Sequence, residues 1–150
     1  MADKMRPQLL VVDDDASVLD ILKRYLEKSA FEVLSARGGA AAIALMQTHG
    51  ATIDLVVLDM TMPDIDGEMT FGELHGLQPD VHFLIYTGGC DNAALARLLA
   101  TGFCSHLIKP TTLWMLERTI LYLLSRHPRL LPTEAAPLPA TAPAATVLLP

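Results

Sequence analysis

Five short apolar runs, each of strand length, alternate along the chain with segments of helical pattern. The first run holds four consecutive aliphatic residues, Leu9 to Val12, which is typical of a strand buried on both faces. The runs lie at residues 8–13, 31–36, 53–59, 81–87 and 104–109. Strands that alternate with helices predict a parallel sheet covered on both sides, and right-handed crossovers favour a doubly wound α/β fold.

Helical periodicity fills the intervals between these runs. After the first run, apolar residues recur at positions 18, 22, 25 and 26, which is the spacing of one helix face. Further helices are predicted at residues 38–50, around residues 69–77, at residues 91–102 and at residues 112–126. Asp91 is the expected N-cap of the fourth helix, and Gly102 lies just past its end.

The composition favours one folded domain, because 150 residues with 51% hydrophobic side chains suffice for a single full core. We expect this domain at residues 8–126, after an N-terminal extension at residues 1–7. Residues 127–150 hold six of the ten prolines and no periodic pattern, which predicts a Pro/Ala-rich tail or linker. The chain is interpreted either as a single-domain protein or as the front of a longer one.

Charge and cysteine content exclude several classes of protein. A net charge of −6 without any run of Lys and Arg argues against binding of nucleic acid or anionic membrane by charge. No signal peptide and no apolar stretch of membrane-spanning length is recognisable. The two cysteines, Cys90 and Cys104, are interpreted as reduced thiols, and we expect a cytoplasmic protein.

Polar side chains follow four of the five predicted strands. Asp13 and Asp14 follow the first strand, Asp59 the third, Thr87 the fourth and Lys109 the fifth. Ligands of a doubly wound sheet bind beyond the carboxyl ends of its strands, where these side chains should meet. Converging carboxylates suit Mg²⁺, which would offset their mutual repulsion. A carboxylate in such a site is suited to accept a phosphoryl group.

Four segments, "VVDDD", "VVLDMTMPDIDG", "YTGG" and "HLIKP", together resemble the receiver domain of bacterial two-component response regulators. The resemblance covers roughly residues 8–126. It implies a flavodoxin-like fold with a five-stranded parallel sheet in the order 2-1-3-4-5 and five helices.

The resemblance also implies a role for each matching residue. Asp59 matches the phosphoacceptor, and Asp13 and Asp14 match the acidic pair that holds Mg²⁺, for which Mn²⁺ is a possible substitute. Thr61 matches the position whose backbone carbonyl completes the metal site. Thr61 and Gly89 also occupy positions that set the rate of phosphoryl loss, and because neither delivers water we expect slow self-dephosphorylation.

A second group of matching residues belongs to the switch. Thr87, followed by the small Gly88, matches the switch hydroxyl, and Lys109 matches the phosphate-binding lysine. The peptide bond between Lys109 and Pro110 is usually cis in the family. His106 stands where the family usually has Tyr or Phe, and we expect a solvated imidazole that is still able to swing inward.

The implied function is a phosphorelay receiver that takes a phosphoryl group from a sensor histidine kinase or a histidine phosphotransfer protein. It is not an enzyme beyond its own phosphoryl transfer and dephosphorylation. Phosphorylation would switch the face built from residues 91–102, 104–109 and 112–126. That face would control a downstream partner or output domain, or form a homodimer.

Two other functions are weighed against this one and are disfavoured. In a haloacid-dehalogenase-type phosphatase Asp13 would be the nucleophile and Asp15 the acid, but only Glu117 and Glu134 follow Lys109 where that family needs an acidic pair. A degenerate receiver would bind partners without phosphorylation. The remaining polar and aromatic residues are interpreted structurally: Asp15 at a helix start, Asp64 and Asp66 in a turn, Trp114 and Tyr122 in packing or a partner surface, and His49, His75, His82 and His127 at the surface.

Overall fold

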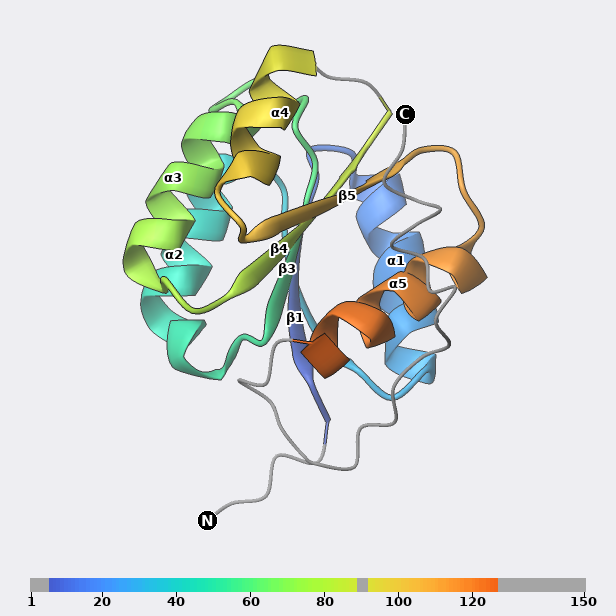
Figure 1. Ribbon diagram of the computed structural model, residues 1–150. Helices are drawn as coiled ribbons and strands as arrows, with labels where there is room; N and C mark the ends of the chain where they lie inside the picture. Colours follow the sequence, from blue (N-terminus) through green and yellow to red (C-terminus); the bar gives the residue numbers. More distant parts are fainter. Residues whose placement is uncertain (1–5, 89–91, 127–150) are drawn as a thin grey trace.

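Five parallel strands form a single sheet in the order β2-β1-β3-β4-β5 (Figure 1). The structure is a computed structural model, and it describes residues 6–88 and 92–126. The strands are β1 Gln8–Val12, β2 Glu32–Ala36, β3 Leu55–Leu58, β4 His82–Thr87 and β5 Cys104–Ile108. The predicted doubly wound α/β fold, with its flavodoxin-like strand order, is therefore confirmed.

Helices cover both faces of the sheet, with α1 and α5 on one side and α2, α3 and α4 on the other (Figure 1). Their bounds are α1 Ala16–Lys28, α2 Gly39–His49, α3 Gly67–Leu77, α4 Asn92–Ala100 and α5 Leu113–Arg126, with a short 3₁₀ turn at Gly50–Thr52. Gly102 follows α4 with a φ of 85°, a left-handed conformation that glycine adopts without strain. The predicted N-cap Asp91, as well as Cys90, Gly89, His127 and the tail, lies outside the described residues.

The central strands are buried on both faces, which explains their continuous apolar sequence. All four residues of β3 are buried, and along β1 successive side chains alternate between two hydrophobic clusters. Leu10 and Val12 pack toward α2 and α3, whereas Leu9 and Val11 pack toward α1 and α5. The sheet is therefore packed closely on both faces and supports the residues at its carboxyl edge.

The register of the strands brings the predicted site residues to the same edge. Val12 of β1 pairs with Leu58 of β3, so that Asp13 and Asp59 leave the sheet side by side. Farther along the same edge, Thr87 of β4 pairs with Ile108 of β5, and the Lys109 amide donates a hydrogen bond to the Thr87 carbonyl at 2.9 Å.

Two histidines are more buried than expected, and for these the surface interpretation is wrong. His82 is only 4% exposed, because it is the first residue of a strand with a neighbour on each side; its Nε2 lies 3.1 Å from the Ser105 hydroxyl. His106 is 2% exposed rather than solvated, because it lies on the face of β5 that α4 covers. His75 is half-buried and stacks on Phe71 with ring centres 5.1 Å apart.

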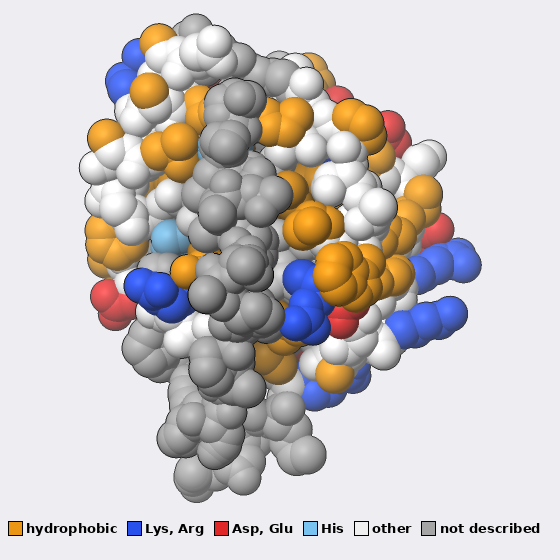
Figure 2. Space-filling model, turned by 45° about the vertical axis from the view of Figure 1, so that its right-hand side comes forward, with side chains coloured by type: hydrophobic (Ala, Val, Ile, Leu, Met, Phe, Trp, Pro, Cys, Tyr) orange, Lys and Arg blue, Asp and Glu red, His pale blue; other side chains and the backbone are white. Residues whose placement is uncertain are grey.

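Several large apolar side chains remain at the surface. Trp114 is 58% exposed at the start of α5, and the Arg118 guanidinium lies 5.6 Å from the centre of its ring. Figure 2 shows hydrophobic side chains exposed among Lys and Arg side chains on the side of the molecule that includes α5. Within the described ranges, every helix is too short or too polar to cross a membrane.

Candidate functional site

Three carboxylates meet at the carboxyl edge of the sheet. Asp13, Asp14 and Asp59 each offer an oxygen such that all three oxygens lie within 4.8 Å of one another. Asp13 and Asp59 are buried at 3% and 6% exposure, and Asp14 is half-buried. Anionic side chains so close together repel one another unless cations join them. The cluster therefore has the donor set and the electrostatic need of a divalent cation site.

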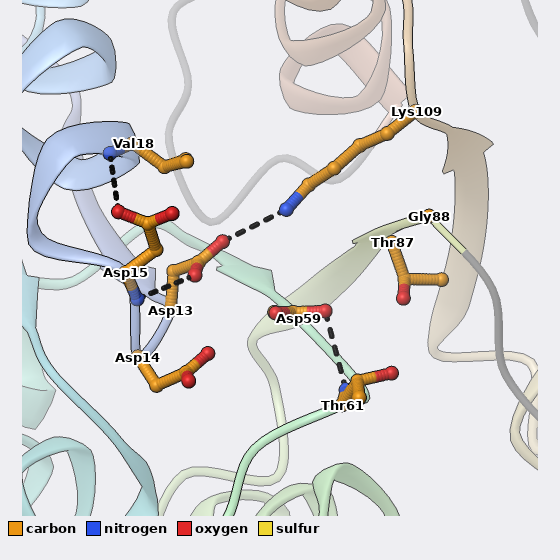
Figure 3. A pocket seen from close by; sticks show the side chains of 9 residues that line it. All are labelled: Asp13, Asp14, Asp15, Val18, Asp59, Thr61, Thr87, Gly88 and Lys109. Carbon is orange, nitrogen blue, oxygen red and sulfur yellow. Dashed lines mark hydrogen bonds and ion pairs between the residues drawn. The ribbon is translucent and has the colours of Figure 1, made fainter.

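Backbone hydrogen bonds fix the loop that carries the acidic pair. The Asp15 amide donates to the Asp13 carboxylate at 2.9 Å (Figure 3), and the Asp15 carboxylate accepts from the Ser17 amide at 2.8 Å. Asp15 is the N-cap of α1, so its predicted place at the helix start is confirmed.

Lys109 brings a positive charge into the cluster from the end of β5. Its Nζ lies 2.9 Å from Oδ2 of Asp13 (Figure 3) and 5.2 Å from the centre of the Tyr86 ring. Burial alone would lower the pKa of Lys109, but the hydrogen bond to Asp13 and the charges of Asp59 and Asp13 outweigh burial and raise it. Lys109 is thus held as a cation, and its peptide bond to Pro110 is cis.

The pKa of Asp59 is raised above its ordinary value. Burial is the largest cause, and the charge of Asp13 acts in the same direction. The Thr61 amide at 3.2 Å, the Lys109 charge and a hydrogen bond from Thr87 favour the carboxylate but do not offset burial. A divalent cation beside Asp59 would lower this pKa and favour the ionised form of the cluster.

These side chains line one open cavity of about 500 Å³ (Figure 3). Its lining brings together nearly all residues singled out from the sequence: Asp13, Asp14, Asp59, Thr61, Thr87, Gly88 and Lys109, with Asp15 and Val18 beside them. His106 does not line the cavity, because its side chain lies inside the protein on β5.

Sequence reasoning missed the contact that anchors the loop after Asp59. Asp66 caps α3 through the Met69 amide at 2.8 Å, as expected of a residue in this turn. Asp64, in contrast, accepts hydrogen bonds from the Gly39 and Ala40 amides at 3.2 and 3.1 Å, at the start of α2. The N-cap of α2, Gly38, has no side chain that could accept hydrogen bonds from the first amides of the helix. This glycine is the sequence signal that a residue from elsewhere in the chain caps α2.

A second missed contact joins α3 to α4 beside the cavity. Arg97 Nε and Nη2 donate to the two carboxylate oxygens of Glu68 at 2.7 and 2.8 Å. The pair is separated by 29 residues, so no local pattern predicts it. It lies at a second cleft of about 390 Å³ that shares Thr61 with the first cavity.

A flavodoxin-like sheet with this acidic edge defines a signalling domain of the receiver type. The family model described as "Response regulator receiver domain" matches residues 9–120. The match covers more than half of the chain, and the protein therefore belongs to the response regulator receiver domain family, a component of two-component systems.

Curated relatives contain such a domain as part of much longer proteins. The chain is 32% identical over 119 residues to the sensor kinase CckA of Brucella abortus, covering 79% of this chain and 12% of the relative. It is 33% identical over 113 residues to the two-component response regulator ORR24 of Oryza sativa, and 35% identical over 112 residues to the transcriptional regulatory protein ZraR of Escherichia coli. It spans 18% and 25% of those two proteins and 75% of itself in each case.

Solved structures share the whole fold. A CheY-like response regulator receiver domain protein from Methanospirillum hungatei superposes with a TM-score of 0.76 at 25% identity, covering 81% of this chain and 96% of that one. The receiver domain of the hybrid histidine kinase CckA superposes with a TM-score of 0.68 at 25% identity, covering 78% and 98%.

Proposed function

We propose that Asp59 accepts a phosphoryl group from a phosphohistidine of a sensor histidine kinase or a histidine phosphotransfer protein. The observation that carries the proposal is the meeting of three carboxylates with Lys109 and Thr87 around one open cavity. Phosphorylation and Mg²⁺ binding are general features of the family to which the chain belongs. The similarity to proteins named as a sensor kinase and a response regulator supports a partner of this class.

The oxygen donors present fit a Mg²⁺ ion, with Mn²⁺ as a substitute. Asp13, Asp14 and Asp59 would hold it together with the backbone carbonyl of Thr61. When bound, the ion neutralises charge on the carboxylates and on the phosphoryl oxygens. The raised pKa of Asp59 supports this assignment, because a cation beside the buried nucleophile would favour its ionised form.

The transfer is an in-line displacement at phosphorus. An oxygen of the Asp59 carboxylate attacks, a phosphorus–oxygen bond forms, and the bond from phosphorus to the donor imidazole nitrogen breaks. The imidazole leaves with the electron pair of that bond. Lys109 and the Thr87 hydroxyl bind the oxygens of the transferred group, and the absent side chain of Gly88 leaves room for it. Lys109 reaches the group by exchanging its contact with Asp13.

Phosphorylation acts on the rest of the molecule through β4, β5 and the helices next to them. Thr87 ends β4 and leads toward α4, and Lys109 ends β5 and leads toward α5. When Thr87 and Lys109 move to bind the phosphoryl group, the face built from α4, β5 and α5 shifts. This face carries the exposed Trp114. We infer that this face contacts a downstream partner, an output domain or a second copy of the chain.

The domain organisation follows the same proposal. Residues 8–126 form the receiver, residues 1–7 an extension, and residues 127–150 a tail or a linker to an output domain. The protein acts in the cytoplasm, in contact with protein partners rather than with nucleic acid or membrane. A phosphatase of the haloacid dehalogenase type is disfavoured, because the Asp15 carboxylate is engaged as the cap of α1.

The test is intact mass spectrometry after incubation with Mg²⁺ and acetyl phosphate. We expect one added phosphoryl group in wild type and none in Asp59→Asn or without the metal. Asp20→Asn is a matched control, because Asp20 is an exposed carboxylate of α1 that pairs with Arg24 and does not line the cavity. A folded wild type that gains no phosphoryl group, from acetyl phosphate or from a panel of kinases, would support the degenerate receiver instead.

A further inference from the structure

His106 is a buried histidine without a hydrogen-bond partner among the described residues. It is 2% exposed, and both Nδ1 and Nε2 are unpaired. Buried polar groups are nearly always paired, so this arrangement lowers the stability of the inward position. Burial also lowers the pKa of the imidazole, which is therefore neutral where it lies.

His106 and Thr87 share one face of the sheet. His106 pairs with Ile85 and Thr87 pairs with Ile108, so the two side chains are diagonal neighbours on adjacent strands. Alternation from Ile85 and Cys104, both in the cluster under α4, places Thr87 and His106 on that side. Thr87 lines the cavity together with Asp59, whereas His106 is buried and does not line it. The inward histidine and a Thr87 side chain at the cavity thus occur together.

Among residues 6–88 and 92–126, the surroundings of His106 contain no charge that would hold a cation there. The side chains facing this region are apolar or neutral: Ile85 and Thr87 of β4, Cys104 of β5, and Ala94, Leu95 and Leu98 of α4. The Cys104 thiol is neutral, because burial raises its pKa to about 12. The charged and titratable groups of neighbouring elements are engaged elsewhere or lie at the cavity: Arg97 with Glu68, His75 against Phe71 and Phe103, and Asp59 and Lys109 at the sheet edge. Asp91 is outside the described residues.

We propose that His106 makes this receiver sensitive to protons, because neutral His106 packs under α4 behind Thr87 whereas protonated His106 leaves for solvent. An imidazolium cannot remain unpaired in an apolar environment. A route outward exists, since β5 is the edge strand and Ile108, the next residue on the same face, is 37% exposed. Departure of the ring removes the support behind Thr87 and frees α4.

The proposal rests on the proposed function and adds a regulator to the same site. Protonation of His106 opposes the binding of a phosphoryl group that contacts Thr87. By linkage, the bound group opposes protonation of His106 to the same extent. Acidification therefore weakens binding of a phosphoryl group or its analogue. His106 has one pKa when the analogue is bound and a higher one when it is absent. At pH values between these two, the affinity for the analogue falls by up to about tenfold for each pH unit of acidification.

The direct test is an NMR titration of the histidine side chains with and without Mg²⁺ and beryllofluoride, a phosphoryl analogue. His106→Phe identifies the His106 signal by its disappearance. We expect a pKa of His106 below the ordinary histidine value and a further fall when the analogue binds. Thr87→Ala distinguishes coupling through the Thr87 hydroxyl from a direct effect of charge on the pKa of His106. The variant still binds the charged Mg²⁺ and beryllofluoride but lacks the hydroxyl. An unchanged pKa on analogue binding, or an equal fall in Thr87→Ala, would overturn the proposal.

A second measurement compares analogue affinity between pH 7.5 and about pH 4.5 in wild type, His106→Phe and His106→Tyr. This range extends well below the ordinary histidine pKa of about 6.5, because the pKa of His106 is lowered by burial. Wild type should lose affinity on acidification, and the variants should lose clearly less. Equal losses in all three proteins would overturn the role of His106 and leave the proposed function intact. Failure of wild type to bind the analogue at any pH would instead overturn the proposed function, and this inference with it.

Discussion

Asp64 should contribute to stability as a cap supplied from outside the helix that it caps. Its carboxylate accepts hydrogen bonds from the Gly39 and Ala40 amides, at the start of a helix whose own N-cap, Gly38, has no side chain. Loss of an N-cap costs about 1 kcal/mol, and a carboxylate at a helix N-terminus contributes a further ~0.3–1 kcal/mol. Because Asp64 is exposed, solvent screens the second contribution, and we expect Asp64→Ala to lower the free energy of unfolding by about 1 kcal/mol.

The assay is thermal and urea unfolding of Asp64→Ala, Asp64→Asn and a matched control. For a domain of this size, about 1 kcal/mol corresponds to a fall in Tm of about 4 °C. Asp64→Asn keeps one acceptor oxygen and loses the charge, so it should fall between wild type and Asp64→Ala. The control is Asp80→Ala, which removes an exposed carboxylate from the turn before β4.

The pH dependence gives an independent check. Hydrogen bonds from the Ala40 amide and then other backbone amides lower the pKa of Asp64. A carboxyl group with a lowered pKa stabilises the fold above its unfolded pKa, and this contribution disappears as the pH falls through the folded pKa. The difference between wild type and Asp64→Ala should therefore shrink in acid. Equal Tm values for Asp64→Ala and Asp80→Ala, or a difference independent of pH, would refute the capping role.

Three further predictions follow from the site and from α3. In the absence of metal, Asp59→Asn should unfold at a higher urea concentration than wild type at pH 7, because it lacks the buried charge. The difference in urea midpoint should narrow as the pH falls through the raised pKa of Asp59, because protonation removes the same charge from wild type. Mg²⁺ at a hundredfold excess over its Kd should stabilise wild type by about 2.7 kcal/mol, measured as a rise in Tm that Asp14→Asn diminishes. Gly67→Ala should cost about 1–3 kcal/mol in urea unfolding, because its Cβ would lie 2.4 Å from the Met60 Cα. Gly72→Ala, in the same helix with nothing within 4 Å of its Cβ, should instead gain about 0.8 kcal/mol.

The sequence predicted which residues gather at the carboxyl edge of the sheet, because strand ends are local features. Asp13, Asp59 and Lys109 each follow an apolar run, and parallel strands carry their ends to one edge whatever lies between them. The structure adds the register of Val12 with Leu58, which sets the two aspartates side by side.

What the sequence could not predict depends on contacts between distant segments. The capping role of Asp64 spans 25 residues, and the pair of Glu68 with Arg97 spans 29. His106 was expected in solvent because histidine is polar, yet packing of α4 on an edge strand buries it. Pattern alone assigns a residue to a strand, but the helix that covers the strand decides whether the side chain meets water.

The ion pair of Lys109 with Asp13 joins residues 96 positions apart, so Asp13 is synthesised long before Lys109. Asp13, Asp14 and Asp59 all emerge from the ribosome before β5 exists. β5 lies at the edge of the sheet beside β4, and it is the last of the five strands to be synthesised. A nascent chain that ends before β5 thus carries the three carboxylates without the lysine that pairs with Asp13. The charges of the site are therefore balanced in this way only after Lys109 has been synthesised and β5 has paired with β4.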